Sequence, residues 1–122
     1  MIAAALAVLL AAGAAGQQAP QVVATVPAEG ANVAPGPFVL TVTFNQPMQP
    51  GSWSFVRTTL AAYPDCDNRP VQSADGRSFS MACRAQAGLA YAIAFNGGRF
   101  RNFRAASGGA SAAPMLLRFH TL

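Results

Sequence analysis

The sequence predicts an all-β protein, an antiparallel β-sandwich of about seven short strands. Three observations lead to this expectation. In several segments apolar and polar residues alternate with the period of a strand. Turn-forming residues, mainly Gly, Pro, Asn and Asp, separate these segments. After residue 16 the sequence has no segment with the apolar period of an amphipathic helix.

An apolar run occupies the N-terminus of the 122-residue chain, from Ile2 to Ala15. It has the length of a signal-peptide core and is too short to span a bilayer. Small residues favour cleavage after Ala14 or Gly16. No Lys or Arg follows Met1, so either the signal is a weak one or the true start lies upstream. The structural alternative is a short buried helix.

We therefore divide the chain into a signal peptide over residues 1–19 and a single domain over residues 20–122. Cleavage is expected near residues 14–19, which leaves a mature protein that begins between Ala15 and Pro20. Such a protein is periplasmic or secreted and is not stably inserted in a membrane after cleavage.

The central expected strand lies in the stretch from Pro37 to Pro50. Its large apolar side chains, which alternate with mostly small and polar ones, are Phe38, Leu40, Val42 and Phe44. One face must therefore pack on a second layer. Pro47 and Pro50 end the strand, since proline donates no hydrogen bond to a sheet.

The other expected strands show the same alternation. They lie over residues 21–26, 52–58, around 71, 77–83, 89–96 and 115–121. Trp53 and Phe55 share a face, and we expect Trp53 in the core because its side chain is large and usually mostly buried. This order of short strands and turns is typical of an immunoglobulin-like sandwich.

The two cysteines, Cys66 and Cys83, suit one disulfide in an oxidising compartment. If the chain folds back at Ala74 and Asp75, the cysteines lie opposite each other, or one step apart if Gly76 makes a bulge. A bridge closing this loop of about 17 residues should stabilise the fold by roughly 3 kcal/mol. Zinc needs more ligands than two cysteines and a single His provide.

The run VVATVPAEGANVAPGPFVLTVTFNQPM carries a family resemblance. Its matching residues are Pro27, Gly30, Asn32, Val33, Pro35, Thr43, Phe44, Asn45, Pro47 and Met48; later matches are Ser73, Asp75, Gly76, Phe79, Gly88, Tyr91, Leu117, Phe119 and Thr121. Over residues 21–122 the chain resembles bacterial Ig-like domains of the SbsA or "Big" type. The resemblance implies a non-catalytic extracytoplasmic module, often one part of a larger surface protein.

The opening is also similar to periplasmic copper carriers of the CopC type, which are small sandwiches as well. Their metal site needs a histidine near the mature N-terminus with further His or Asp ligands, or a cluster of methionines. Here His120 is the only histidine, and Met48, Met81 and Met115 lie at strand positions or strand ends. The similar architecture makes a copper or small-ligand carrier the alternative function. Because the ligands of that copper site are missing from the sequence, we expect no cofactor.

Few residues offer catalytic chemistry. His120 is expected on the outer face of the last strand, where it has no partner for a hydrolase triad. Asp65 and Asp67 could form a carboxylate pair or a Ca²⁺ site, but we interpret them as loop residues that bond their own backbone. Asn45 and Asn96 end strands, and we expect their side chains to bond local backbone. An enzyme is not expected.

Arg99, Phe100, Arg101, Phe103 and Arg104 form the one segment that suggests binding. The chain has eight Arg, no Lys and four acids, a net charge of +4, and no acid follows Asp75. Three arginines beside two aromatic rings could dock an acidic protein or envelope component. The alternative is that both Phe rings pack under the loop while the arginines stay solvated. In an exported protein a nucleic acid partner is not expected.

Overall fold

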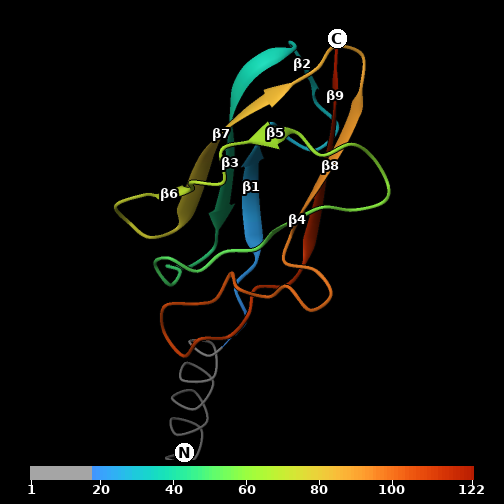
Figure 1. The fold of residues 1–122 in the computed structure, drawn as a ribbon. Helices are drawn as coiled ribbons and strands as arrows, with labels where there is room; N and C mark the ends of the chain where they lie inside the picture. The colour runs from blue at the N-terminus through green and yellow to red at the C-terminus, as the bar shows by residue number, and fades with distance from the viewer. Residues whose placement is uncertain (1–17) are drawn as a thin grey trace, which may run out of the picture.

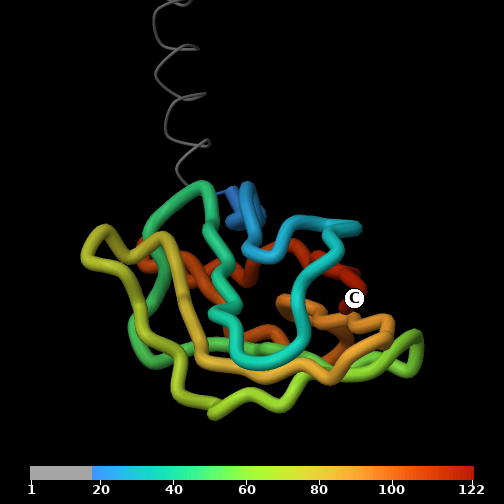
Figure 2. Tube along the Cα trace, turned by 90° about the horizontal axis from the view of Figure 1, so that it is seen from above, coloured from blue at the N-terminus to red at the C-terminus, as the bar shows by residue number. Residues whose placement is uncertain are grey.

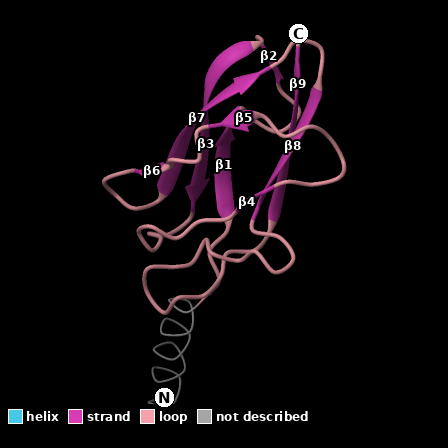
Figure 3. Ribbon diagram, in the orientation of Figure 1, coloured by secondary structure: helices cyan, strands magenta, loops and turns pink. Residues whose placement is uncertain are grey.

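A computed structural model describes residues 18–122, and the core of the predicted signal peptide lies outside the described residues. The described chain consists of strands and loops arranged as two facing sheets (Figure 1, Figure 3). The strands are β1 (Val22–Val26), β2 (Asn32–Val33), β3 (Gly36–Phe44), β4 (Phe55–Val56), β5 (Asp65–Cys66), β6 (Val71–Gln72), β7 (Ser78–Ala85), β8 (Ala90–Phe95) and β9 (Met115–Thr121). The all-β sandwich predicted from the sequence is confirmed.

The first sheet has the order β1-β3-β7-β5, with β6 also paired to β7, and the second has the order β2-β9-β8-β4. All pairs are antiparallel except β2 with β9, which is parallel. Figure 2 shows the chain from the end of the sandwich at which the C-terminus lies. The long connection between β8 and β9 lies at the opposite end (Figure 1).

Strand β3 is the centre of the first sheet and has the alternation that the sequence predicts. Leu40, Val42 and Phe44 are at most 1% exposed, and Phe38 packs edge-to-face on Phe119 of the other sheet. On the outer face, the hydroxyls of Thr43 and Ser78 are 2.8 Å apart across β3 and β7. A one-residue slip of β3 would exchange these two faces, so the buried apolar row specifies its register.

The core between the sheets contains a cluster of phenylalanine rings. Phe103, which belongs to the β8–β9 connection, is fully buried, and its ring centre lies 5.0–5.2 Å from those of Phe44, Phe55 and Phe79. Edge-to-face and tilted contacts at such distances stabilise aromatic pairs beyond the burial of their area. A loop residue therefore completes the centre of the core.

Some expected elements differ from the observed ones. Strand β4 covers only Phe55–Val56 of the expected strand over 52–58. Trp53 is half-buried and makes an edge contact with Phe79, because it lies beside an edge strand where no further strand covers it. Strand β5 lies outside the strands expected from the sequence. Leu89, the first residue of the strand expected over 89–96, precedes β8 and is 38% exposed.

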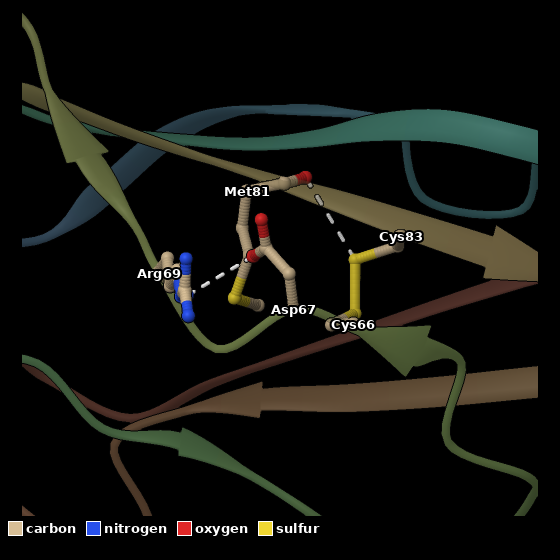
Figure 4. Close-up of a disulfide and its surroundings, with 5 residues drawn as sticks. All are labelled: Cys66, Asp67, Arg69, Met81 and Cys83. Atoms are coloured by element: carbon tan, nitrogen blue, oxygen red, sulfur yellow. Dashed lines mark hydrogen bonds between the residues drawn. A yellow bond between two sulfur atoms is a disulfide. The ribbon is translucent and has the colours of Figure 1, made fainter.

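The hairpin that ends in β7 places the two cysteines as predicted, but by a different path. The turn is centred on Asp75 and Gly76, one residue later than expected, since Gln72 pairs with Phe79. Two extra residues between β5 and β6, including Asn68 with its φ of 58°, then shift the register. Cys66 consequently lies opposite Cys83, and the two form a disulfide (Figure 4).

The turn itself is held by side-chain hydrogen bonds. The Ser73 hydroxyl donates to the Asp75 carboxylate, and the Arg77 backbone N–H donates to the same oxygen at 3.0 Å. These bonds favour the charged carboxylate, the Ser73 bond most, and they lower the pKa of Asp75 below its ordinary value. At Gly76, with φ of 76°, an added Cβ would also lie 3.5 Å from Pro47.

Candidate binding surface

The connection between β8 and β9 begins at Asn96, which is fully buried and has a φ of 60°. Its side-chain amide donates to the backbone carbonyls of Phe103 and Ala112 at 3.1 and 3.0 Å. Its side-chain oxygen accepts the Phe103 backbone N–H at 3.0 Å. The expected bonding to local backbone was wrong for Asn96, because it links segments 7 and 16 residues away.

This linkage separates the five residues that the sequence suggested for partner binding. Phe103 is held inside the core, so its side chain is unavailable to a partner. The alternative, that both Phe rings pack under the loop, is wrong for Phe100. Phe100 is 49% exposed, and the guanidinium carbon of Arg99 lies 5.2 Å from its ring centre. Arg101 is exposed and donates from Nε to the Gly98 carbonyl, whereas Arg104 is half-buried.

Phe100 also lines a hollow on the described surface with a volume of about 430 Å³. This volume falls in the range of ligand pockets, about 300–1,000 Å³. The lining residues come from the region around β4, from the segment between β5 and β6, from β7 and from the β8–β9 connection. They are Trp53, Ser54, Phe55, Val56, Arg57, Asn68, Pro70, Met81 and Phe100.

One wall of the hollow follows directly after the disulfide. The Asp67 backbone N–H still donates to the Ala82 carbonyl of β7 at 3.0 Å, and the segment from Asn68 to Pro70 then leaves the ladder. The Asp67 carboxylate accepts the Arg69 backbone N–H at 3.0 Å. Met81 of β7 lines the hollow together with Asn68 and Pro70 of this segment, and Figure 4 shows Met81 near the disulfide. The Cys66–Cys83 bridge therefore anchors the wall to β7 at the point where the wall begins.

The opposite wall is tied to the segment before β4. The Ser54 hydroxyl accepts the Asn102 backbone N–H at 3.0 Å, and the Ser52 hydroxyl donates to the Asn102 carbonyl. These bonds hold the β8–β9 connection, with Phe100, next to Trp53. Trp53 was the one residue in the sequence that could have indicated this hollow. We expected it only in the core, and it lines the hollow as well.

One arginine, Arg57, lines the hollow, and Arg99 and Arg101 flank the lining residue Phe100 in the chain. The guanidinium carbon of Arg57 lies 4.5 Å from the Tyr63 ring centre, and Tyr63 has its pKa raised by burial, an effect that Arg57 opposes. Within residues 18–122 the one ion pair joins Arg118 to Glu29. Arg57, Arg99 and Arg101 therefore keep their charge available for an anionic group.

The candidate catalytic and metal-binding residues lie on different strands, His120 on β9 and Asp65 on β5. His120 is exposed on the outer face of β9, opposite Ala90 of β8 and Asn32 of β2. Asp65 and Asp67 are both exposed at β5. In residues 18–122 no three His, Cys, Asp or Glu side chains come together to hold a metal ion.

The methionines and the other strand-ending asparagine also have structural positions. Met48 and Met81 are each 2% exposed in the core, and Met115 is half-buried. The Asn45 side-chain oxygen accepts the Gln21 backbone N–H at 3.0 Å, a contact 24 residues away, so the expected local bonding was wrong here as well. It joins the end of β3 to the start of β1.

Comparison with known proteins gives one match. The family model described as bacterial Ig-like domain matches residues 16–121. No curated protein and no solved structure matches the chain. Over the part of the chain that the structure describes, no helix is both long and apolar enough to cross a membrane.

Proposed function

Because this chain belongs to the family of bacterial Ig-like domains, we propose that it is an exported, non-catalytic module that binds an acidic partner in the cell envelope. Domains of this family generally occur in surface or envelope proteins of bacteria. The proposed binding surface consists of Arg99, Phe100 and Arg101 together with the hollow that Phe100 lines. The partner is an acidic protein or another acidic component of the envelope.

The observation that carries the proposal is the exposure of Phe100, which lines the hollow, has the Arg99 guanidinium over its ring and is followed in the chain by the exposed Arg101. A half-exposed aromatic ring is poorly hydrated and gains free energy when a partner covers it. Aromatic residues and Arg are the residue types most enriched at the energetic centres of interfaces. Arg also bonds carboxylates through two parallel N–H groups, which favours an acidic partner.

The test uses three acidic probes: vesicles containing phosphatidylglycerol, immobilised alginate and immobilised polyglutamate. We expect the mature domain to bind at least one of them at low salt, and to release it near 0.5 M salt because screening shortens to about 4 Å. The double substitution Arg99→Ser/Arg101→Ser should abolish this binding.

A matched control removes the same charge elsewhere. Arg84→Ser/Arg118→Ser removes the same formal charge at two exposed arginines outside the proposed surface, of which Arg118 is paired with Glu29, and should leave binding nearly unchanged. Equal binding of the two double variants would reduce the interaction to net charge and contradict the proposed surface. Absence of binding by the unchanged domain to all three probes would contradict an acidic partner.

Export is tested separately. We expect N-terminal sequencing of the periplasmic or secreted protein to find a first residue between Ala15 and Pro20. A protein that keeps Met1, or that is found only in the cytoplasm, would contradict this part of the proposal.

A further inference from the structure

Strand β4 is the edge of the second sheet, and its outer side faces the hollow. It pairs with β8 on one side only, with Phe55 opposite Phe95 and Val56 opposite Ala94. The Asn96 backbone N–H donates to the Ser54 carbonyl at 3.0 Å, so Ser54 and Asn96 occupy a hydrogen-bonded pair position of the ladder. In an antiparallel ladder the next pair is not hydrogen-bonded, and the N–H and C=O of Phe55 therefore point away from β8.

The first sheet also ends at this side of the sandwich. Strand β5 is its last strand, and the segment with Asn68 and Pro70 bulges away from β7. The hollow thus lies between the edges of two sheets, and Phe55 and Met81 line it from the two sides. An open sheet edge with unpaired backbone groups can accept an extended peptide as an additional strand.

The chemistry of the lining favours a side chain over a sugar. Six lining residues are apolar, namely Trp53, Phe55, Val56, Pro70, Met81 and Phe100. The polar side chains are Ser54, Arg57 and Asn68, and the Ser54 hydroxyl already accepts a backbone N–H. A sugar ring carries hydroxyls around its edge that would lose their water without enough partners here. A bulky apolar side chain needs no such partners.

The charge around the hollow selects what flanks that side chain. Arg57 lines the hollow, and Arg99 and Arg101 neighbour Phe100 in the chain. The wall segment carries one acid, Asp67, and one further exposed arginine, Arg69, so it adds no net negative charge to this side. Acidic residues on both sides of the apolar anchor would therefore meet complementary charge.

We propose that the hollow is a docking site for an extended acidic segment of another protein, which pairs with the Phe55 backbone and inserts one bulky apolar side chain between Trp53 and Phe100. This rests on the proposed function, since it names the class of the acidic partner. Main-chain hydrogen bonds to the β4 edge align the segment, and the apolar anchor gives it specificity.

The experiment selects binders from a displayed library of random twelve-residue peptides on the mature domain. We expect enriched peptides to carry a central Phe, Leu, Ile or Trp with Asp or Glu on both sides. Phe100→Ser, at a half-exposed position, should weaken the best synthetic peptide at least tenfold. Leu60→Ser, at a position that is 70% exposed and outside the hollow, should change its affinity less than twofold.

A second comparison tests the strand pairing without altering the protein. The best peptide is resynthesised with N-methyl groups at alternate residues, in two versions that block opposite edges. One version should lose at least tenfold in affinity, and the other should keep most of it, because only one edge of an added strand can pair with β4. Equal affinities of both versions would contradict strand addition.

The remaining outcomes separate this inference from the function on which it rests. No enriched peptide, together with arginine-dependent binding to alginate or vesicles, would overturn the peptide site and leave the acidic-partner proposal standing. Enriched peptides that bind Phe100→Ser as well as the unchanged domain would also overturn the site. Absence of binding to the peptides and to all acidic probes would contradict both proposals.

Discussion

Replacement of Asn96 by Ala should destabilise this domain more than any other change of a single polar side chain described above. Asn96 makes three hydrogen bonds in a fully buried position, two as donor and one as acceptor. Its loss would leave the Phe103 N–H and the Ala112 carbonyl without these partners. The Phe103 carbonyl would keep one bond, because it also accepts the Ala112 N–H at 2.8 Å.

The magnitude follows from these two groups and from the backbone. An unsatisfied buried donor or acceptor costs about 1–3 kcal/mol, so two cost about 2–6 kcal/mol. Asn96 has a φ of 60°, a conformation that disfavours Ala by about 1–2 kcal/mol. The expected loss of about 3–8 kcal/mol compares with a total stability of about 5–15 kcal/mol for a small domain.

Urea unfolding followed by Trp53 fluorescence measures this loss, with two controls. Asn96→Gly tolerates the positive φ, so it should lose about 1 kcal/mol less than Asn96→Ala. Asn45→Ala, at an exposed strand end with one side-chain bond, should cost no more than about 1 kcal/mol. Equal, small losses for Asn96→Ala and Asn45→Ala would refute the assignment of Asn96 as the anchor of the connection.

Three further expectations concern the core, the disulfide and the turn. Phe44→Ala should cost about 3–5 kcal/mol of unfolding free energy in urea, because it empties a buried site. Thr43→Ala loses one half-buried hydroxyl bond and should cost about 1 kcal/mol. Similar losses for the two variants would contradict the register of β3. Intact-mass analysis with an alkylating reagent should find Cys66 and Cys83 unmodified until reductant is added. Reduction of the bridge should lower the free energy of unfolding by about 3 kcal/mol. Free thiols without reductant would contradict the bridge. The folded pKa of Asp75 is lowered, so its charged carboxylate should stabilise the fold above the ordinary carboxyl pKa, and this stabilisation should be lost as pH falls through the folded pKa. Asp75→Asn should therefore destabilise the domain at pH 7 and have little effect near pH 2. An equal loss of stability at both pH values would exclude the charge as its origin.

The long strands could be predicted because each has one face in the core. In β3, β7 and β9 the buried residues recur at every second position, as at Phe79 and Met81 or Leu117 and Phe119. A period of two is a property of local sequence, and it appears without any knowledge of the partner strand. For the same reason the outer positions, such as Thr43, could be assigned to the other face.

The short strands and the binding surface could not be predicted in the same way. Strands β2 and β5 have two residues each, too few to show a period. In the segment RFRNFR, Phe100 and Phe103 have the same type of neighbours, yet one is half-exposed and the other fully buried. The difference depends on bonds from Asn96 to the backbone of Phe103, which local sequence does not encode as a pattern.

The two walls of the hollow are fixed by different means, and this bears on how the domain can bind. The wall that includes Asn68 and Pro70 begins at a disulfide, and the wall that includes Phe100 is held to the strands through Asn96 and Ser54. Ordering a flexible side chain on binding costs about 0.5–1.5 kcal/mol, and loops add to that cost. Because both walls are anchored before a partner arrives, most of that cost is met during folding. A small, open hollow can then give useful affinity to a single inserted side chain, while the solvated arginines, which contribute mainly to the rate of encounter, need no ordering in the free protein.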